Sequence, residues 1–394
     1  MNPIKLSMRL FLCVSFGAFL SLSMLNAQPQ PPQGPRPPAI VSPEVSGDMV
    51  TFRLYSKEAT TVNLSGDWIP RGEDEDLVKN DSGIWSVQVG PLKPEFYNYY
   101  FTVNGVRTID PANPHTVRDG TRYASCFIMP GEGSDLYEVN DVPHGNLTRA
   151  WYPSPLLGLQ RRMYVYTPAG YPESSASYPV LYLLHGGGGD EDAWTTMGRA
   201  CYIMDNLIAG GKALPMIVVM TNGNPGQTAA VTDRKPAPEG RGPMGMGNND
   251  FPNSLVNDVI PYIESHYRVL QDNEHRAIAG LSMGALQTQI TSINNPALFH
   301  YIGVFSIGLQ MEFGESTTEL IKAYDSNLSK LEQNGYKLFY IGCGVDDFVY
   351  EGVTLLRQKL DEHDFKYIYN ETSGGHTWAN WRIYLSDFAP RLFR

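Results

Sequence analysis

The chain has 394 residues, of which 42% are hydrophobic and 18% charged, a composition that excludes a largely disordered protein and allows two or three domains. Its formal net charge of −11, from 30 basic and 41 acidic residues, argues against a nucleic-acid partner, because phosphate binding needs a basic surface. A neutral or weakly acidic substrate is compatible with this charge.

The first 27 residues have the pattern of a secretory signal peptide. Lys5 and Arg9 precede an apolar run over 10–25, which ends near the small residue Ala27. An uncleaved membrane anchor is the alternative, but the run is short and serines interrupt it. We therefore expect a secreted or periplasmic protein with no membrane association after cleavage.

The cysteines do not indicate a disulfide framework. Of the four in the chain, Cys13 would leave with the signal peptide, so Cys126, Cys201 and Cys343 remain, an odd number. Export permits one disulfide without requiring it. We expect three buried thiols.

A proline-rich segment, 28–43, follows the signal and is expected to be an extended spacer. Residues 44–140 then contain short alternating or aromatic runs, each bounded by Gly, Pro, Asp or Asn. Strands are expected at 49–56, 60–66, 83–89, 96–105 and 123–129. Their spacing predicts a small β-sandwich over 44–140.

From about residue 160, short apolar strands alternate with longer helical patterns. Strands are expected at 162–169, 179–186, 216–223, 276–281, 301–308, 337–344 and 366–372. Helical patterns lie at 254–267, 285–295, 316–335, 352–364 and 377–393. Strands that are apolar throughout are typical of a parallel sheet covered on both faces. The alternation predicts an α/β domain over 141–394 with a mainly parallel sheet, and residues 141–160 join it to the sandwich.

The motif Gly-Leu-Ser-Met-Gly, at 280–284, places Ser282 between an apolar strand and a helical pattern. This is the setting of a nucleophile elbow. Gly280 and Gly284 would allow the strained turn and the close contact of helix with strand, where a Cβ would collide. A glycine-rich turn that happens to hold a serine is the alternative, which the position between strand and helix disfavours.

A serine nucleophile needs a base, and the base needs a carboxylate to orient it. In an α/β-hydrolase the order along the chain is Ser, then Asp or Glu, then His. Of the histidines after Ser282, His300 precedes a strand and His363 ends a helical pattern, whereas His376 follows a strand at the carboxyl edge of the sheet, where ligands bind. We therefore expect His376 to be the base.

Asp346 and Asp347 both follow the strand that precedes the last one, which is where the acid of such a triad belongs. One would accept from the imidazole N–H, and the other is expected to cap a turn or bind a backbone amide. The residues alone do not separate the two.

The glycine run 186–189, directly after the strand at 180–184, offers backbone amides for an oxyanion hole. An amide of Gly186 or Gly187 and the N–H of Met283 would form the pair of donors. A phosphate-binding loop is the alternative, but the run lacks the lysine and the spacing of such loops. His185 is expected to be structural. The histidines show no paired ligand spacing, so we expect neither a metal nor another cofactor.

Four motifs resemble the feruloyl and acetylxylan esterases of carbohydrate esterase family 1, in the broader esterase D group. They are VLYLLHGGGGDEDAW (180–194), AGLSMGA (279–285), GVDDFVYEG (344–352) and GGHTWANWRIYLSDFAPRLF (374–393). The resemblance covers about 140–394 and implies an α/β-hydrolase fold with Ser282 as nucleophile and His376 as base. It implies Asp347 as the acid, since the family keeps the second acidic position before an aromatic residue, and an oxyanion hole from Met283 and the region 186–188.

The stretch YNYYFTVNGVRTIDPANP (97–114) resembles the early-set immunoglobulin-like modules grouped with the family 48 carbohydrate-binding modules. The resemblance makes four aromatic residues candidates for stacking on sugars: Trp68, Trp85, Tyr97 and Tyr100. Burial in the core of the sandwich is the alternative for all of them.

The segment 222–251 is rich in Gly, Pro and Met and leaves the carboxyl end of a strand, where loops form substrate pockets. Met244 and Met246 are expected to line an acyl pocket, since methionine adapts to flat rings. A disordered surface insertion is the alternative. Trp194 and Trp378, within the motifs above, complete the candidate substrate-binding residues.

The sequence thus favours an exported serine esterase that removes feruloyl or acetyl groups from plant xylan through an acyl-enzyme, with cell-wall polysaccharide as its partner. A siderophore-ester hydrolase or an acyltransferase of the same fold is an alternative, and so, from a different class, is a non-catalytic carbohydrate-binding protein. All proposed chemical groups lie after residue 180. We therefore expect the catalytic half to cleave small esters without the β-domain, and the β-domain to act on the polymer.

Overall fold

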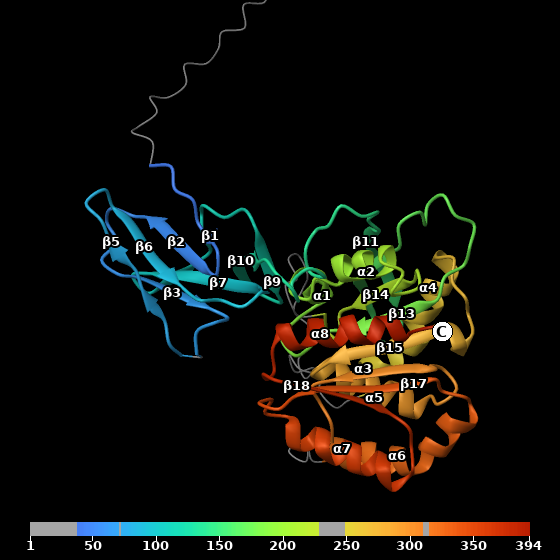
Figure 1. Ribbon diagram of the computed structural model, residues 1–394. Coiled ribbons are helices and arrows are strands. Elements are labelled where there is room, and N and C mark those ends of the chain that lie inside the picture. Colours follow the sequence, from blue (N-terminus) through green and yellow to red (C-terminus); the bar gives the residue numbers. More distant parts are fainter. Residues whose placement is uncertain (1–37, 71, 228–248, 310–314) are drawn as a thin grey trace, which may run out of the picture. The chain divides into compact units, whose positions relative to one another are not determined.

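The computed structural model describes residues 38–70, 72–227, 249–309 and 315–394 (Figure 1). Residues 40–394 belong to one compact unit. In chain order, this unit contains an antiparallel β-sandwich, which ends at Met129, and then a larger mixed β-sheet, which begins at Asn146.

The sandwich is built from two antiparallel sheets with one shared core. The first has the order β1 (Glu44–Ser46), β2 (Met49–Tyr55), β6 (Ile84–Val89), β5 (Val78–Lys79). The second has the order β4 (Glu75–Asp76), β3 (Val62–Gly66), β7 (Glu95–Val103), β10 (Arg122–Met129), β9 (Thr116–Asp119), with β8 (Val106–Thr108) paired to β7. Every second residue of β2 is buried, and Phe52 packs there against Tyr99 and Phe127 of the other sheet. This alternation is the pattern that predicted the sandwich.

The second sheet has the order β11-β12-β14-β13-β15-β16-β17-β18. Its strands are β11 (Asn146–Ser154), β12 (Leu159–Thr167), β13 (Val180–Leu184), β14 (Ile217–Thr221), β15 (Arg276–Leu281), β16 (Tyr301–Phe305), β17 (Leu338–Gly344) and β18 (Ile368–Thr372). Strands β13 to β18 pair in parallel, while β12 runs antiparallel to β14 and β11 antiparallel to β12. The expected α/β-hydrolase fold with a mainly parallel sheet is confirmed.

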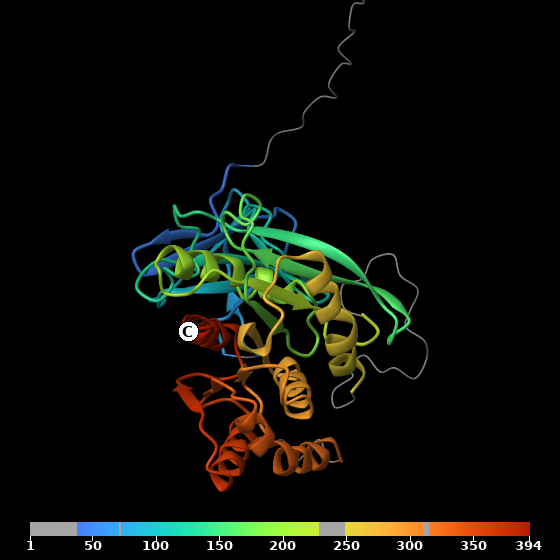
Figure 2. The same cartoon turned by 90° about the vertical axis from the view of Figure 1, so that its right-hand side faces the viewer.

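Helices cover both faces of this sheet (Figures 1 and 2). Their bounds are α1 (Ala193–Thr196), α2 (Ala200–Ala209), α3 (Asp250–Ser254), α4 (Ile260–His266), α5 (Met283–Asn294), α6 (Glu315–Gln333), α7 (Tyr350–Glu362) and α8 (Trp378–Phe388), with a π-helical segment (Leu255–Val259) and 3₁₀ turns (Asn273–His275, Ala389–Arg391). Helices α2 and α8 pack in one hydrophobic cluster, and α3 to α7 in the other. Within the described ranges, no helix combines the length and the apolar character needed to cross a membrane.

Three elements differ from the expectation. Strand β11 lies within the segment 141–160, which was expected to be a connection, and helices α1 and α2 follow the glycine run. Strand β11 is an edge strand whose first four residues are all exposed, so its sequence lacks the apolar run of an interior strand. Cys126 and Cys343 are buried free thiols as expected, whereas Cys201 is only partly buried.

The sandwich and the mixed sheet share part of one core. Phe96, Val117 and Cys126 of the sandwich belong to the same cluster of buried side chains as Trp194 and Ile203 of the α/β part. The two halves are therefore packed against each other and are not joined only by the chain.

Candidate active site

Ser282 lies in the turn between β15 and α5, with φ 50° and ψ −117°. A positive φ is strained for a residue with a side chain. The flanking glycines make this turn possible. A Cβ on Gly280 would lie 2.5 Å from the backbone of Gly284, and one on Gly284 would lie 2.6 Å from the carbonyl oxygen of His185. The local sequence therefore folds as an elbow that presents the serine at the carboxyl edge of the sheet.

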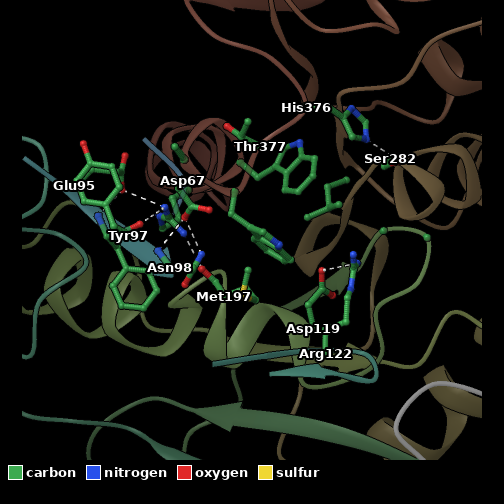
Figure 3. Close-up of a pocket in the computed structure, with 18 residues that line it drawn as sticks. Asp67, Glu95, Tyr97, Asn98, Asp119, Arg122, Met197, Ser282, His376 and Thr377 are labelled. Carbon is green, nitrogen blue, oxygen red and sulfur yellow. Dashed lines mark hydrogen bonds and ion pairs between the residues drawn. The ribbon is translucent and has the colours of Figure 1, made fainter. Parts of the chain in front are cut away.

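His376 brings its imidazole between Ser282 and Asp347. Its Nε2 lies 2.9 Å from Ser282 Oγ (Figure 3). Its Nδ1 lies 3.0 and 3.1 Å from the two carboxylate oxygens of Asp347. With the Nδ1 proton shared with the carboxylate, Nε2 is left to accept from the serine hydroxyl. Thr377 caps α8 directly after the histidine, since its side chain accepts from the N–H of Asn380, and so fixes the end of this turn.

The two aspartates after β17 have different surroundings. The Asp347 side chain is fully buried, and its Oδ1 also accepts from the N–H of Val349 at 3.1 Å. Asp346 is exposed. The structure thus brings Asp347, and not Asp346, within reach of His376, as the resemblance implied.

Both ring nitrogens of His185, which directly follows β13, form hydrogen bonds with backbone groups. Its Nδ1 lies 2.8 Å from the carbonyl oxygen of Gly186, and its Nε2 accepts from the N–H of Gly223 at 2.8 Å. Burial lowers the pKa of this imidazole, more than the nearby carboxylates and the Gly186 carbonyl raise it. A neutral ring with its proton on Nδ1 satisfies both partners, so the side chain links the glycine run to the loop after β14.

Backbone N–H groups of the glycine run and of α5 lie near Ser282. Gly186 is close to the serine, because a Cβ on it would lie 3.4 Å from Ser282 Cβ. Met283 is the first residue of α5, whose opening N–H groups have no intrahelical acceptor. Among the hydrogen bonds of the described residues, none engages the N–H of Gly187 or Met283. Both groups are therefore available to a ligand beside Ser282 Oγ.

An arginine of the sandwich holds the loop that carries these glycines. Arg118, on β9, donates to both carboxylate oxygens of Asp190 at 2.6 and 3.2 Å, and its Nε donates to Asp192 at 3.0 Å. Its backbone carbonyl also accepts from the hydroxyl of Thr196 at 2.8 Å. Sequence reasoning missed Arg118, because no local pattern distinguishes it from other arginines on short strands.

A cavity of about 450 Å³ opens in front of Ser282 (Figure 3). Both halves of the protein line it. The α/β part contributes Gly186, Gly187, Met197, Leu281, Ser282, His376, Thr377, Trp378, Ala379, Trp381 and Arg382, and the sandwich contributes Asp67, Glu95, Phe96, Tyr97, Asn98, Asp119 and Arg122. The sandwich is therefore part of the wall of this cavity.

Buried polar contacts of Arg382 fix that shared wall. Arg382, of which 1% is exposed, donates to the carboxylate of Glu95 and to the carbonyl of Phe96, both at 3.0 Å. These contacts join the sandwich to α8, which follows His376.

The residues expected to bind substrate differ in whether they line this cavity. Trp378 lines the cavity, while Trp194 is 1% exposed, donates its Nε1–H to the Leu184 carbonyl at 2.9 Å and packs edge-on against Trp378. Trp194 thus supports Trp378 from behind and does not reach the cavity, which corrects its expected role. Met244 and Met246 lie outside the described residues. In the described part of the chain, no group of three or more His, Cys, Asp or Glu residues is arranged to hold a metal ion.

Comparison with known proteins places these features in a family. Residues 154–392 match the Esterase family model, and residues 39–115 match carbohydrate-binding module 48, the isoamylase N-terminal domain. The chain is 32% identical over 350 residues to an endo-1,4-β-xylanase/feruloyl esterase of Xylanibacter ruminicola, covering 87% of this chain and 44% of that protein. It is 25% identical over 255 residues to endo-1,4-β-xylanase Y of Acetivibrio thermocellus, covering 58% of this chain and 21% of that protein. The chain thus spans less than half the length of these two relatives.

Solved structures agree with the fold. A ferulic acid esterase of the anaerobic fungus Anaeromyces mucronatus is 26% identical, with a TM-score of 0.55 over 66% of this chain and 95% of that one. The enterobactin esterase of Shigella flexneri is 15% identical, with a TM-score of 0.62 over 87% of this chain and 92% of that one, a likeness of fold alone. Because the Esterase model matches more than half of the chain, this protein belongs to that family of α/β-hydrolases.

Proposed function

We propose that the protein is an exported serine esterase that hydrolyses feruloyl or acetyl esters carried by plant xylan. One observation carries the proposal. The hydroxyl of Ser282 lies 2.9 Å from an imidazole nitrogen of His376, whose other nitrogen pairs with the buried carboxylate of Asp347. This is the arrangement that makes a serine hydroxyl nucleophilic.

In the first half of the reaction, Ser282 Oγ attacks the ester carbonyl carbon while His376 Nε2 takes the hydroxyl proton. The carbonyl oxygen becomes an oxyanion, which accepts from the N–H groups of Gly187 and Met283. Asp347 holds the imidazole in place and stabilises its positive charge. When the tetrahedral intermediate collapses, the bond to the alcohol oxygen breaks, and His376 gives its proton to that oxygen. The alcohol leaves and Ser282 carries the acyl group.

In the second half, water attacks the acyl-enzyme. His376 accepts a proton from the water as its oxygen bonds to the acyl carbon, and the same two N–H groups stabilise the second oxyanion. Collapse of this intermediate breaks the bond to Ser282 Oγ, to which His376 returns the proton. The carboxylic acid leaves and the serine is regenerated. A sugar hydroxyl in place of water would make the same enzyme an acyltransferase.

Several findings support xylan as the polymer. The relative in Xylanibacter ruminicola is named as a xylanase and feruloyl esterase, and the structural neighbour of 26% identity is named as a ferulic acid esterase. The family 48 module suits a protein that meets polysaccharide. The net charge of −11 suits a substrate without phosphate groups.

Export is supported by residues 1–27, which have the pattern of a signal peptide. Sequencing the N-terminus of the mature protein would test it.

The test is to incubate the protein with feruloylated and with acetylated arabinoxylan and to identify the acid that is released. Ser282→Ala should release neither acid and should melt like the wild type. A serine-directed fluorophosphonate should label Ser282 in the wild type, and Ser326→Ala, which changes an exposed serine on α6, should behave as the wild type. Turnover by a folded Ser282→Ala protein would refute the assigned nucleophile. Release of acid only from siderophore esters, or from no ester at all, would refute the assigned substrate.

A further inference from the structure

One large apolar side chain beside the candidate triad is almost entirely exposed. Phe348 directly follows Asp347, and its exposed fraction of 79% is the highest among the large hydrophobic residues that the structure describes. An exposed ring adds little to the free energy of folding, because burial of apolar surface supplies that energy. Phe348 also lies outside the lining of the cavity in front of Ser282. Neither the core nor that cavity therefore accounts for its position.

The ring of Phe348 is packed against the imidazole of His376. The two ring centres lie 4.5 Å apart, and the ring planes are inclined at 46°. The carboxylate that binds the histidine also closes the turn that carries the phenylalanine. Asp347 Oδ1 accepts from the N–H of Val349 at 3.1 Å and lies 3.0 Å from His376 Nδ1. Because an aspartate bonded to a backbone N–H two residues on fixes a turn, this carboxylate sets the places of both rings.

A second aromatic ring lies against the same imidazole. Trp381, on α8, is edge-on to it, with the ring centres 5.0 Å apart and the planes at 89°. Trp381 is buried, and its Nε1–H donates to Ser306 Oγ at 3.0 Å, so its ring is held in the core. The imidazole of His376 therefore has two aromatic neighbours, of which one is buried and the other is open to solvent.

The hydrogen bonds that orient this imidazole change during the proposed reaction. Before an ester reacts, Nδ1 binds Asp347 and Nε2 accepts from the hydroxyl of Ser282. In the acyl-enzyme the serine oxygen is esterified and has no proton to donate, so the second bond is lost. Asp347 then holds one edge of the ring only, through two oxygens at nearly equal distances of 3.0 and 3.1 Å from Nδ1. The packing of the neighbouring rings is what keeps Nε2 in place at this stage.

We propose that Phe348 is a positioning residue of the second half of the reaction. Its ring keeps the imidazole of His376 oriented while Ser282 carries the acyl group, so that Nε2 can accept a proton from the attacking water. This inference rests on the proposed function. Because Phe348 acts through His376 and not through the substrate, its effect should be the same for every acyl group.

The first experiment separates the two halves of the reaction with 4-nitrophenyl acetate. The burst of 4-nitrophenol gives the rate constant of acylation, and the decay of the acetyl-enzyme, followed by rapid quench and mass spectrometry, gives that of deacylation. Phe348→Ala should lower the rate constant of deacylation roughly three- to tenfold, the value of one aromatic pair, and that of acylation by less than about twofold. Phe348→Tyr keeps the flat ring and should retain both wild-type values, whereas Phe348→Leu keeps only apolar volume and should resemble Phe348→Ala. The melting temperature should stay unchanged, because the ring is exposed.

Trp151→Ala is the matched control, since it removes an exposed ring from β11 that does not line the cavity. It should leave both rate constants as in the wild type. Deacylation at the wild-type rate in Phe348→Ala would overturn the proposal, and so would equal losses in the two halves. The same measurement with 4-nitrophenyl ferulate should give the same loss. A loss confined to one acyl group would also overturn the proposal, because the ring would then contact the substrate.

The second experiment needs no turnover. Ser282→Ala removes the hydroxyl that binds Nε2, as acylation does, so its crystal structure shows how the imidazole is held without that bond. His376 should keep one orientation in Ser282→Ala, with Nδ1 next to Asp347, and should occupy more than one in Ser282→Ala/Phe348→Ala. A single, unchanged orientation in the double variant would overturn the role of Phe348. Absence of any acyl-enzyme in the wild type would instead refute the proposed esterase, and the two crystal structures would still decide whether Phe348 orients the ring.

Discussion

The guanidinium group of Arg118, on a strand of the sandwich, donates two hydrogen bonds to the carboxylate of Asp190, which is fully buried. Asp190 directly follows the glycine run whose Gly187 N–H we assign to the oxyanion hole. The N-terminal half of the chain is thus attached to the loop that would stabilise negative charge during the reaction.

Arg118→Ala should lower kcat on a small ester such as 4-nitrophenyl acetate by roughly 10- to 100-fold, with little change in KM. The reason is that a displaced oxyanion hole weakens binding of the transition state and not of the substrate. Arg118→Lys keeps the charge without the two-pronged geometry and should give an intermediate kcat. The measurement is steady-state kinetics of both variants.

Arg53→Ala is the matched control for this substitution, since it removes an arginine of the same sandwich whose partner Glu44 is exposed. It should leave kcat as in the wild type. A wild-type kcat in Arg118→Ala, together with a lowered melting temperature, would show that Arg118 acts only on stability.

Removal of the sandwich should abolish activity on small esters as well as on polymer. A chain that begins at Asp141 lacks Arg118 and Glu95, so Asp190 and Arg382 lose their ion-pair partners, and the loop that carries the glycine run is no longer held by the sandwich. This outcome is the opposite of what the order of motifs along the sequence indicates. The check is 4-nitrophenyl acetate turnover alongside thermal melting, and a stable, fully active fragment would refute the coupling of the two halves.

Asp347→Asn should lower kcat by roughly 10²- to 10⁴-fold, because an amide would favour the wrong tautomer of His376. Asp346→Asn, at the exposed neighbouring position, is the control and should stay within a few-fold of the wild type. Both kcat values come from the same small-ester assay, with folding checked by circular dichroism. If the ranking of the two variants were reversed, Asp346 would be the acid.

The buried His185 should make stability depend on pH. Burial lowers its pKa in the folded protein below the ordinary value of about 6.5, so between the two pKa values the unfolded chain binds more protons. The free energy of unfolding contributed by the neutral ring is therefore fully present above about pH 6.5 and is lost as the pH falls through the folded pKa. His185→Gln keeps a donor and an acceptor but does not titrate. Urea unfolding at pH 5.5 and 7.5 should show a larger loss of stability at low pH in the wild type than in the variant, and parallel losses would contradict the assignment.

The sequence by itself determined most elements of the α/β domain, though not β11, α1 and α2, and it determined the position of the elbow. Apolar runs such as Val180–Leu184 are all buried, and the glycines around Ser282 leave no room for a Cβ. These features are local. A buried strand or helix face requires apolar residues at regular positions in a short stretch of sequence, and a strained turn restricts which residues can stand in it. The proximity of Ser282 and His376 could also be predicted from the sequence, because each follows a strand and the carboxyl ends of parallel strands meet at one edge of the sheet.

Only the tertiary structure decided which aspartate faces His376, that Trp194 lies behind Trp378, and that the sandwich lines the cavity. Arg118 and Asp190 are 72 positions apart, and Arg382 and Glu95 are 287 apart. Neither pair belongs to a periodic pattern. Contacts of this kind depend on how two separately patterned halves pack together, and that packing depends on shape and charge complementarity across an interface, which no stretch of sequence contains by itself.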